Sequence, residues 1–213
     1  MRKTIIIAAL LGITNIINAQ NPKYIAAMER NVATLDTTRD GAILQNLANT
    51  FERIGSAEKT EWLPQYYAAY CYINMTYTTK GSTIDTYCDK AETFLKKADS
   101  INPNNSEIYT LKAQASSARI SVSPMTRGQK YGTMAAEIRE QAKKFDPANP
   151  RPYYLEGTGY FYTPPMFGGG KDKAKASFEK ALTMFETFKP ASSIAPRWGK
   201  NSTEYFLKQC ESK

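Results

Sequence analysis

The chain has 213 residues, of which 42% are hydrophobic and 23% charged, with a formal net charge of +8. This balance is that of a globular protein, and it excludes collagen, a low-complexity tail and a polytopic membrane protein. Histidine is absent, which excludes histidine-based acid–base catalysis, histidine metal sites and histidine-activated nucleophiles.

The N-terminal segment predicts export. Arg2 and Lys3 precede an apolar run over residues 5–13, and Ala19 closes the segment, which is the pattern of a cleaved signal peptide over residues 1–19. A membrane anchor is the alternative, but polar residues interrupt the run and it is shorter than the roughly 20 apolar residues of a span. We therefore expect a mature domain over residues 20–213, located in the periplasm or secreted, with no membrane span.

Charge and cysteine content give little indication of a partner. Removing Arg2 and Lys3 leaves 26 basic residues against 20 acidic ones, and we interpret the lysine excess as solvated helix faces. An exported protein is not expected to bind nucleic acid. Cys71 and Cys88 would lie out of level on paired helices, so we expect them to be free thiols rather than a disulfide.

Two helices are predicted at the start of the mature domain. Apolar residues at helical spacing cover residues 24–35 and 42–54, and the polar segment 36–41 separates them. We interpret them as a degenerate helix pair over residues 22–57.

Three later segments share a pattern of small residues. Residues 91–98, 135–142 and 174–181 each begin and end with alanine, and Pro103 and Pro147 follow the first two segments. Small residues on one helical face let neighbouring helices approach closely, and proline stops a helix where the chain turns. The pattern therefore predicts a repeat of helix pairs.

The helix before each of these segments carries aromatic and small residues at fixed spacing. The clearest case is Tyr153, Gly157 and Tyr160, with Ala69 and Ala113 at the corresponding positions of the earlier units. In this pattern the chain resembles the tetratricopeptide repeat (TPR) family. The resemblance implies an all-α solenoid of helical hairpins, with units near residues 62–103, 106–147 and 150–188 and a capping helix over residues 200–211, in which Tyr205 and Phe206 would point inward.

Each unit is longer than the family's repeat of about 34 residues. The surplus lies between its two helices, at residues 78–83, 121–132 and 163–170. Because equivalent turns of a solenoid align, we expect the three insertions to emerge on one edge of the stack.

No residue pattern predicts catalysis. The run Gly168–Lys171 lacks the remaining residues of a phosphate-binding loop, and the three cysteines lack metal-ligand spacing. We therefore predict no catalytic residues, no metal site and no cofactor, and we do not expect an enzyme.

The first helices of TPR stacks line the concave face, and this face supplies the predicted binding site. Its residues are aromatic or polar, and tyrosine suits a wet groove because it presents an apolar ring with a polar tip. The predicted partner-binding residues are Tyr66, Tyr70, Asn74, Thr110, Gln114, Ser117, Tyr154, Thr158, Phe161 and Tyr162.

Together these features lead us to expect an exported, non-catalytic scaffold that binds a protein or peptide in its concave groove. The alternative is a small-ligand carrier or an accessory subunit of a periplasmic uptake system, with a pocket at the inter-helix loops. The apolar loop Pro164–Phe167 favours this alternative. No pattern in the sequence indicates an oligomeric state.

Overall fold

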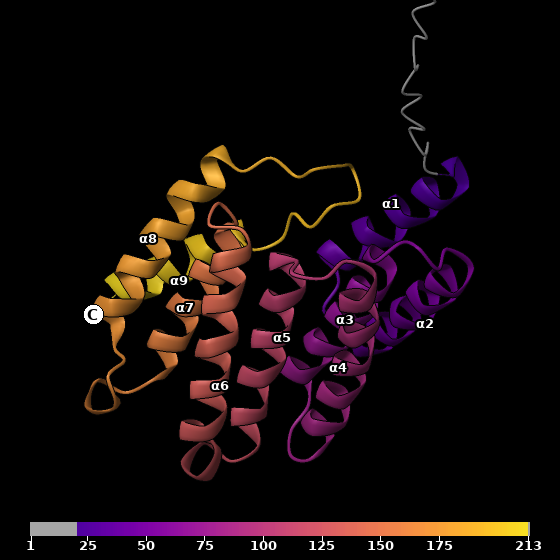
Figure 1. Ribbon diagram of the computed structural model, residues 1–213. Coiled ribbons are helices and arrows are strands. Elements are labelled where there is room, and N and C mark those ends of the chain that lie inside the picture. Colours follow the sequence, from indigo (N-terminus) through magenta and orange to yellow (C-terminus); the bar gives the residue numbers. More distant parts are fainter. Residues whose placement is uncertain (1–20, 213) are drawn as a thin grey trace, which may run out of the picture.

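The computed structural model describes residues 21–212, and the predicted signal peptide lies outside them. Within this range the chain is all-α, as predicted, and consecutive helices pack as hairpins (Figure 1). The helices are α1 (Pro22–Thr37), α2 (Gly41–Ala57), α3 (Leu63–Met75), α4 (Thr83–Ile101), α5 (Ser106–Ala118), α6 (Pro124–Phe145), α7 (Pro150–Tyr162), α8 (Lys171–Thr187) and α9 (Lys200–Glu211), with short 3-10 turns at Thr76–Thr78, Arg119–Val122 and Pro165–Phe167.

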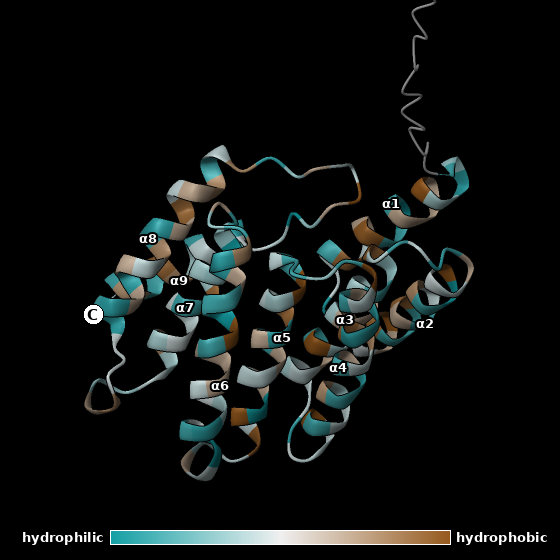
Figure 2. Ribbon diagram, in the orientation of Figure 1, coloured by the Kyte–Doolittle hydropathy of each residue, from teal (hydrophilic) through white to brown (hydrophobic). Residues whose placement is uncertain are grey.

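Local sequence signals set where several helices begin. The Asn105 side chain accepts hydrogen bonds from the backbone N–H groups of Glu107 and Ile108, and Asn149 accepts one from Arg151, so both asparagines cap their helices. Proline occupies the first turn of α1, α6 and α7, where its missing N–H costs no helical hydrogen bond. Figure 2 shows hydrophobic and hydrophilic residues alternating along the helices, as expected for helices with one buried face.

The small residues of the repeat lie at helix contacts. Ala91, Ala135 and Ala174 are at most 2% exposed. At Gly157 a Cβ atom would lie 2.4 Å from the Phe178 ring, so only glycine lets α7 approach α8 this closely. The interpretation of these positions as close contacts is confirmed.

Enlarging these alanines is expected to destabilise the stack. Ala135→Leu and Ala174→Leu should each lower the free energy of unfolding by about 1 to 3 kcal/mol, because a well-packed core must shift to admit the extra atoms. The measurement is urea denaturation. Ala176→Leu is the matched control, since Ala176 is exposed on the same helix as Ala174. Equal midpoints for Ala174→Leu and Ala176→Leu would contradict the assigned contacts.

The connections within hairpins share one edge of the molecule. The links between α3 and α4, between α5 and α6, and between α7 and α8 all lie at the lower edge in Figure 1. The expectation that the links emerge on one edge is therefore confirmed, but the extent of the second insertion is wrong, because residues 124–132 are helical and lengthen α6 instead of forming a loop.

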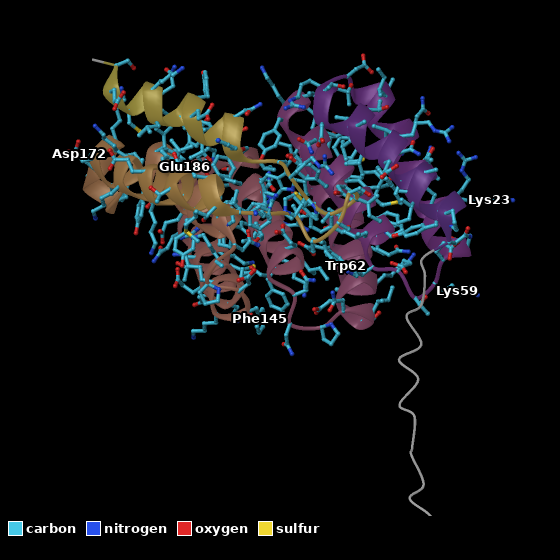
Figure 3. The ribbon with its side chains drawn as sticks, turned by 90° about the horizontal axis from the view of Figure 1, so that it is seen from above. Lys23, Lys59, Trp62, Phe145, Asp172 and Glu186 are labelled. Atoms are coloured by element: carbon cyan, nitrogen blue, oxygen red, sulfur yellow. The ribbon has the colours of Figure 1, made fainter. Side chains whose placement is uncertain are left out.

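A C-terminal strap, residues 188–199, joins the two ends of the stack. It leaves α8, crosses toward α1 and returns to α9, as both Figure 1 and the view from above in Figure 3 show. The Tyr67 hydroxyl donates a hydrogen bond of 2.8 Å to the Ile194 carbonyl. Ile194 is fully buried among core residues of α1 to α5. The sequence predicts only a loop here, and the structure shows that the loop is anchored.

Candidate functional site

Aromatic side chains from α3, α7, α9 and the strap form a continuous row. The Trp198 ring stacks on Tyr70 at a centroid distance of 5.0 Å and meets Tyr154 edge-on at 6.3 Å. Phe206 of α9 lies 6.4 Å from Tyr154 and 5.3 Å from Phe161. We call this set the aromatic row; its members are Tyr70, Trp198, Tyr154, Phe206, Phe161 and Tyr162.

Tyr77 adds an exposed phenol beside this row. Its ring is 65% exposed, and Tyr162 is 72% exposed. The Tyr77 hydroxyl accepts a hydrogen bond of 2.9 Å from Gln114 Nε2. It lies near enough to the row that Tyr162 raises the pKa of Tyr77 and Tyr77 raises the pKa of Tyr154. We call the aromatic row together with Tyr77 the aromatic site.

The tyrosines of the aromatic site are held as neutral phenols. Burial is the main factor that raises the pKa of Tyr70 and Tyr154, and loss of hydration around the hydroxyl raises the pKa of Tyr77 and Tyr162 although their side chains are largely exposed. Neighbouring phenols raise the pKa of Tyr154 further. At neutral pH the site therefore offers apolar ring faces with hydroxyl groups that donate and accept hydrogen bonds.

An alkaline titration tests these shifts. The folded chain is expected to show less phenolate absorbance than the urea-unfolded chain above about pH 10, where free tyrosines ionise. Because the folded-state pKa values are raised, the unfolded chain binds fewer protons at that pH, and the free energy of unfolding should fall as the pH rises further. Coincident phenolate curves for folded and unfolded protein would contradict the shifts.

The structure brings together four of the residues that the sequence proposes for binding, namely Tyr70, Tyr154, Phe161 and Tyr162. Gln114 is buried but reaches the site through Tyr77. Asn74 and Thr158 are half-buried and donate hydrogen bonds to backbone carbonyls within their own helices. Ser117 is exposed and is not a member of the aromatic site.

Tyr66 and Thr110 do not reach the surface. Both are 0% exposed. Tyr66 packs edge-on against Tyr67, and the Thr110 hydroxyl donates to the Ser106 carbonyl of its own helix. These two side chains therefore have no exposed surface with which to contact a partner directly.

Sequence reasoning missed Trp198 and Tyr77. Tyr77 lies seven residues after Tyr70, a spacing that places both on one helical face, so a signal was present. Trp198 lies in a loop, where no periodicity indicates which way a side chain points. The expectation that Tyr205 points inward is wrong: it is 58% exposed, because the adjacent Phe206 occupies the inward position.

Two cavities lie away from the aromatic site. A cavity of about 270 Å³ lies between α1 and the strap, lined in part by Asp36 and Arg197. Another of about 260 Å³ lies at the loop before α8, lined in part by Pro165 and Lys171. Both are smaller than the roughly 300 to 1,000 Å³ of typical small-molecule pockets.

The structure also bears on the expectations of free thiols, of no metal site and of no membrane span. Cys71 and Cys88 are free and buried, and burial raises the pKa of the Cys88 thiol to about 12. Residues 21–212 contain no group of three or more Cys, Asp or Glu side chains placed to hold a metal ion. Over the same residues, no helix has the length and apolar character needed to span a bilayer.

Comparison with known proteins identifies two informative structures. No family model and no curated protein matches the chain. The structure of the HusA haemophore from Porphyromonas gingivalis matches with a TM-score of 0.82 and 37% sequence identity, covering 90% of this chain and 94% of that one. The crystal structure of TTC0263, a TPR protein from Thermus thermophilus, matches with a TM-score of 0.62 and 16% identity, covering 88% and 80%. The second match confirms the TPR-like fold.

Proposed function

This chain belongs to the family of the HusA haemophore, and we propose that it binds haem or a related tetrapyrrole on the aromatic site without catalysing a reaction. This is the small-ligand alternative to a peptide scaffold, with the ligand placed on the aromatic site rather than in a pocket at the loops. The observation that carries the proposal is the aromatic row, in which six rings from three helices and the strap touch in sequence.

A planar macrocycle suits a site of this kind. Aromatic pairs prefer offset-stacked or edge-to-face arrangements, and each adds about 0.5 to 1.5 kcal/mol beyond the burial of its area. The row already shows both arrangements among its own members. Tyr77 and Tyr162 present exposed ring surface at its edge, so a ligand can contact them without displacing core residues.

The polar groups of the site match the rim of such a ligand. Haem carries carboxylate side chains, which accept hydrogen bonds. The Tyr77 hydroxyl accepts from Gln114, so its own proton remains available for an acceptor on the ligand. Outside the predicted signal peptide, the excess of 26 basic over 20 acidic residues also favours the approach of an anionic molecule.

Iron ligation is not expected to provide most of the affinity. The chain has no histidine, and Cys71 and Cys88 are buried in the core. Burial also raises the pKa of the half-buried Cys210 thiol, which disfavours the thiolate that would ligate iron. Tyrosine ligates haem iron in some proteins, but raised pKa values disfavour the phenolate here. We therefore propose that the site recognises the macrocycle itself.

A peptide partner receives less support. Trp198 of the strap occupies the face of Tyr70, which the sequence assigns to an open groove. Family membership and this arrangement both favour a compact planar ligand.

Titration with haem and with iron-free protoporphyrin tests the proposal. Both ligands are expected to bind residues 20–213, shifting the visible absorbance band of the ligand and quenching Trp198 fluorescence in a Trp62→Phe background. The background variant is needed because the chain contains two tryptophans. Binding of haem alone would refute recognition of the macrocycle, and binding of neither would refute the proposed function.

A further inference from the structure

Arg151 carries its charge inside the protein. Its side chain is fully buried, and its Nη1 donates a hydrogen bond of 2.8 Å to Glu107 Oε1 of α5. Its Nη2 donates to the carbonyl of Pro196 in the strap at 2.5 Å. The guanidinium also lies 5.3 Å from the centre of the Trp198 ring. The Arg151 side chain of α7 thus forms hydrogen bonds to both α5 and the strap.

Glu107 continues these contacts to the aromatic site. Its Oε2 accepts a hydrogen bond of 3.3 Å from the Tyr66 hydroxyl. The Tyr66 oxygen in turn accepts one of 2.8 Å from Trp198 Nε1. An indole N–H can only donate, so Trp198 is the donor to the Tyr66 oxygen. The Tyr66 hydroxyl in turn donates its own proton to the Glu107 carboxylate.

The contacts form a closed ring of interactions. From Arg151 one branch runs through Pro196 to the backbone of the strap, and the other runs through Glu107 and Tyr66 to the indole of Trp198. Both branches end on the same short segment of the strap. The strap backbone two residues before Trp198 and the Trp198 indole are therefore both held, with the Trp198 ring stacked on Tyr70.

A buried ion pair is an expensive way to hold a loop if stability alone is needed. Charges lose their hydration on burial, and well-packed apolar residues often serve stability as well or better. Here Arg151 Nε remains without a hydrogen-bond partner. The arrangement gains orientation, because the guanidinium donates to two partners and the carboxylate accepts from two donors, and these directional hydrogen bonds define orientations that apolar packing leaves free.

We propose that Tyr66, Glu107 and Arg151 are positioning residues for ligand binding, which hold the Trp198 ring in the orientation that completes the aromatic row. None of them contacts the ligand; they act through Trp198. This inference rests on the proposed function, since it assigns a role in the same site.

Tyr66→Phe is the variant that tests the inference. It keeps the buried ring and the Arg151–Glu107 pair but removes the oxygen that links Glu107 to Trp198. The matched control is Tyr67→Phe, which removes a buried hydroxyl that donates to Ile194 of the same strap and does not touch Trp198. Both are made in the Trp62→Phe background, so that emission reports on Trp198 alone, and circular dichroism checks the fold.

We expect Tyr66→Phe to raise the dissociation constant for iron-free protoporphyrin about fivefold to tenfold, the effect of one buried hydrogen bond. It should also lower the emission anisotropy of Trp198 in the absence of ligand. Tyr67→Phe should change neither quantity appreciably. In a Trp198→Phe background, Tyr66→Phe should cause no further loss of affinity, because the residue through which it acts is gone.

The outcomes separate the two proposals. If the starting protein binds tetrapyrrole and Tyr66→Phe behaves like Tyr67→Phe in affinity and anisotropy, the positioning inference is overturned and the proposed function stands. An additional loss from Tyr66→Phe in the Trp198→Phe background would also overturn it. If the starting protein binds no tetrapyrrole, the proposed function fails, and the positioning inference fails with it.

Discussion

Replacing Tyr77 and Tyr162 together by alanine is expected to weaken the binding of haem and of iron-free protoporphyrin on the order of a hundredfold. Interface aromatics that act as hot spots often contribute ~2 kcal/mol or more each, and about 1.4 kcal/mol corresponds to a factor of ten. Both side chains are largely exposed, so their loss should leave the thermal midpoint close to that of the parent. Fluorescence titration measures the affinity, and circular dichroism measures the midpoint.

The matched control is Met166→Ala with Phe167→Ala. These residues are 82% and 68% exposed and lie in the loop before α8, outside the aromatic row. Their removal should change affinity much less than removal of the two tyrosines. If the loop variant abolishes binding and the tyrosine variant does not, the ligand binds at the inter-helix loops and the aromatic site should be abandoned.

The second large effect concerns stability. Arg151→Met is expected to lower the free energy of unfolding by about 3 kcal/mol, because it leaves the largely buried Glu107 carboxylate without its partner charge. Adding Glu107→Gln to Arg151→Met should recover part of the loss, since the orphaned charge is then removed as well. Chemical denaturation of the three proteins measures both effects.

A surface pair provides the comparison for this prediction. Lys175 lies 3.8 Å from Glu179 on α8, and both side chains are substantially exposed. Lys175→Met should cost no more than about 1 kcal/mol, because solvent screens such pairs. Equal losses from Arg151→Met and Lys175→Met would show that the buried pair contributes nothing special to the fold.

The fold could be predicted because its signals are local. Alanines seven residues apart, as at Ala91 and Ala98 or at Ala135 and Ala142, lie on one helix face and mark where that face needs close contact, and this need depends only on the helix itself. The close helix contact at Gly157 could also be predicted, since the spacing of Gly157 from Tyr153 and Tyr160 matches the repeat pattern. The structure places Ala91, Ala135 and Tyr153 at buried positions and Gly157 in close contact with Phe178.

The candidate site could be predicted only in part. Tyr70, Tyr154, Phe161 and Tyr162 follow from helical phase, because the first helices of the hairpins face one side. Helical phase does not predict Trp198 or the ion pair between Arg151 and Glu107. The residues in these contacts lie far apart in sequence, and no periodic pattern connects them. The same composition of tyrosines also suits a peptide or a planar ligand, so the choice between them rests on the strap and on family membership.

The most direct test of the central claim is to map the contact surface by ¹H–¹⁵N NMR while iron-free protoporphyrin is added. We predict large shifts for the indole N–H of Trp198 and for the backbone of Tyr77, Tyr154 and Tyr162. Residues 29–36 and 165–173, which border the two cavities, should change little. Shifts confined to either of those cavities, with the Trp198 indole unmoved, would contradict the account.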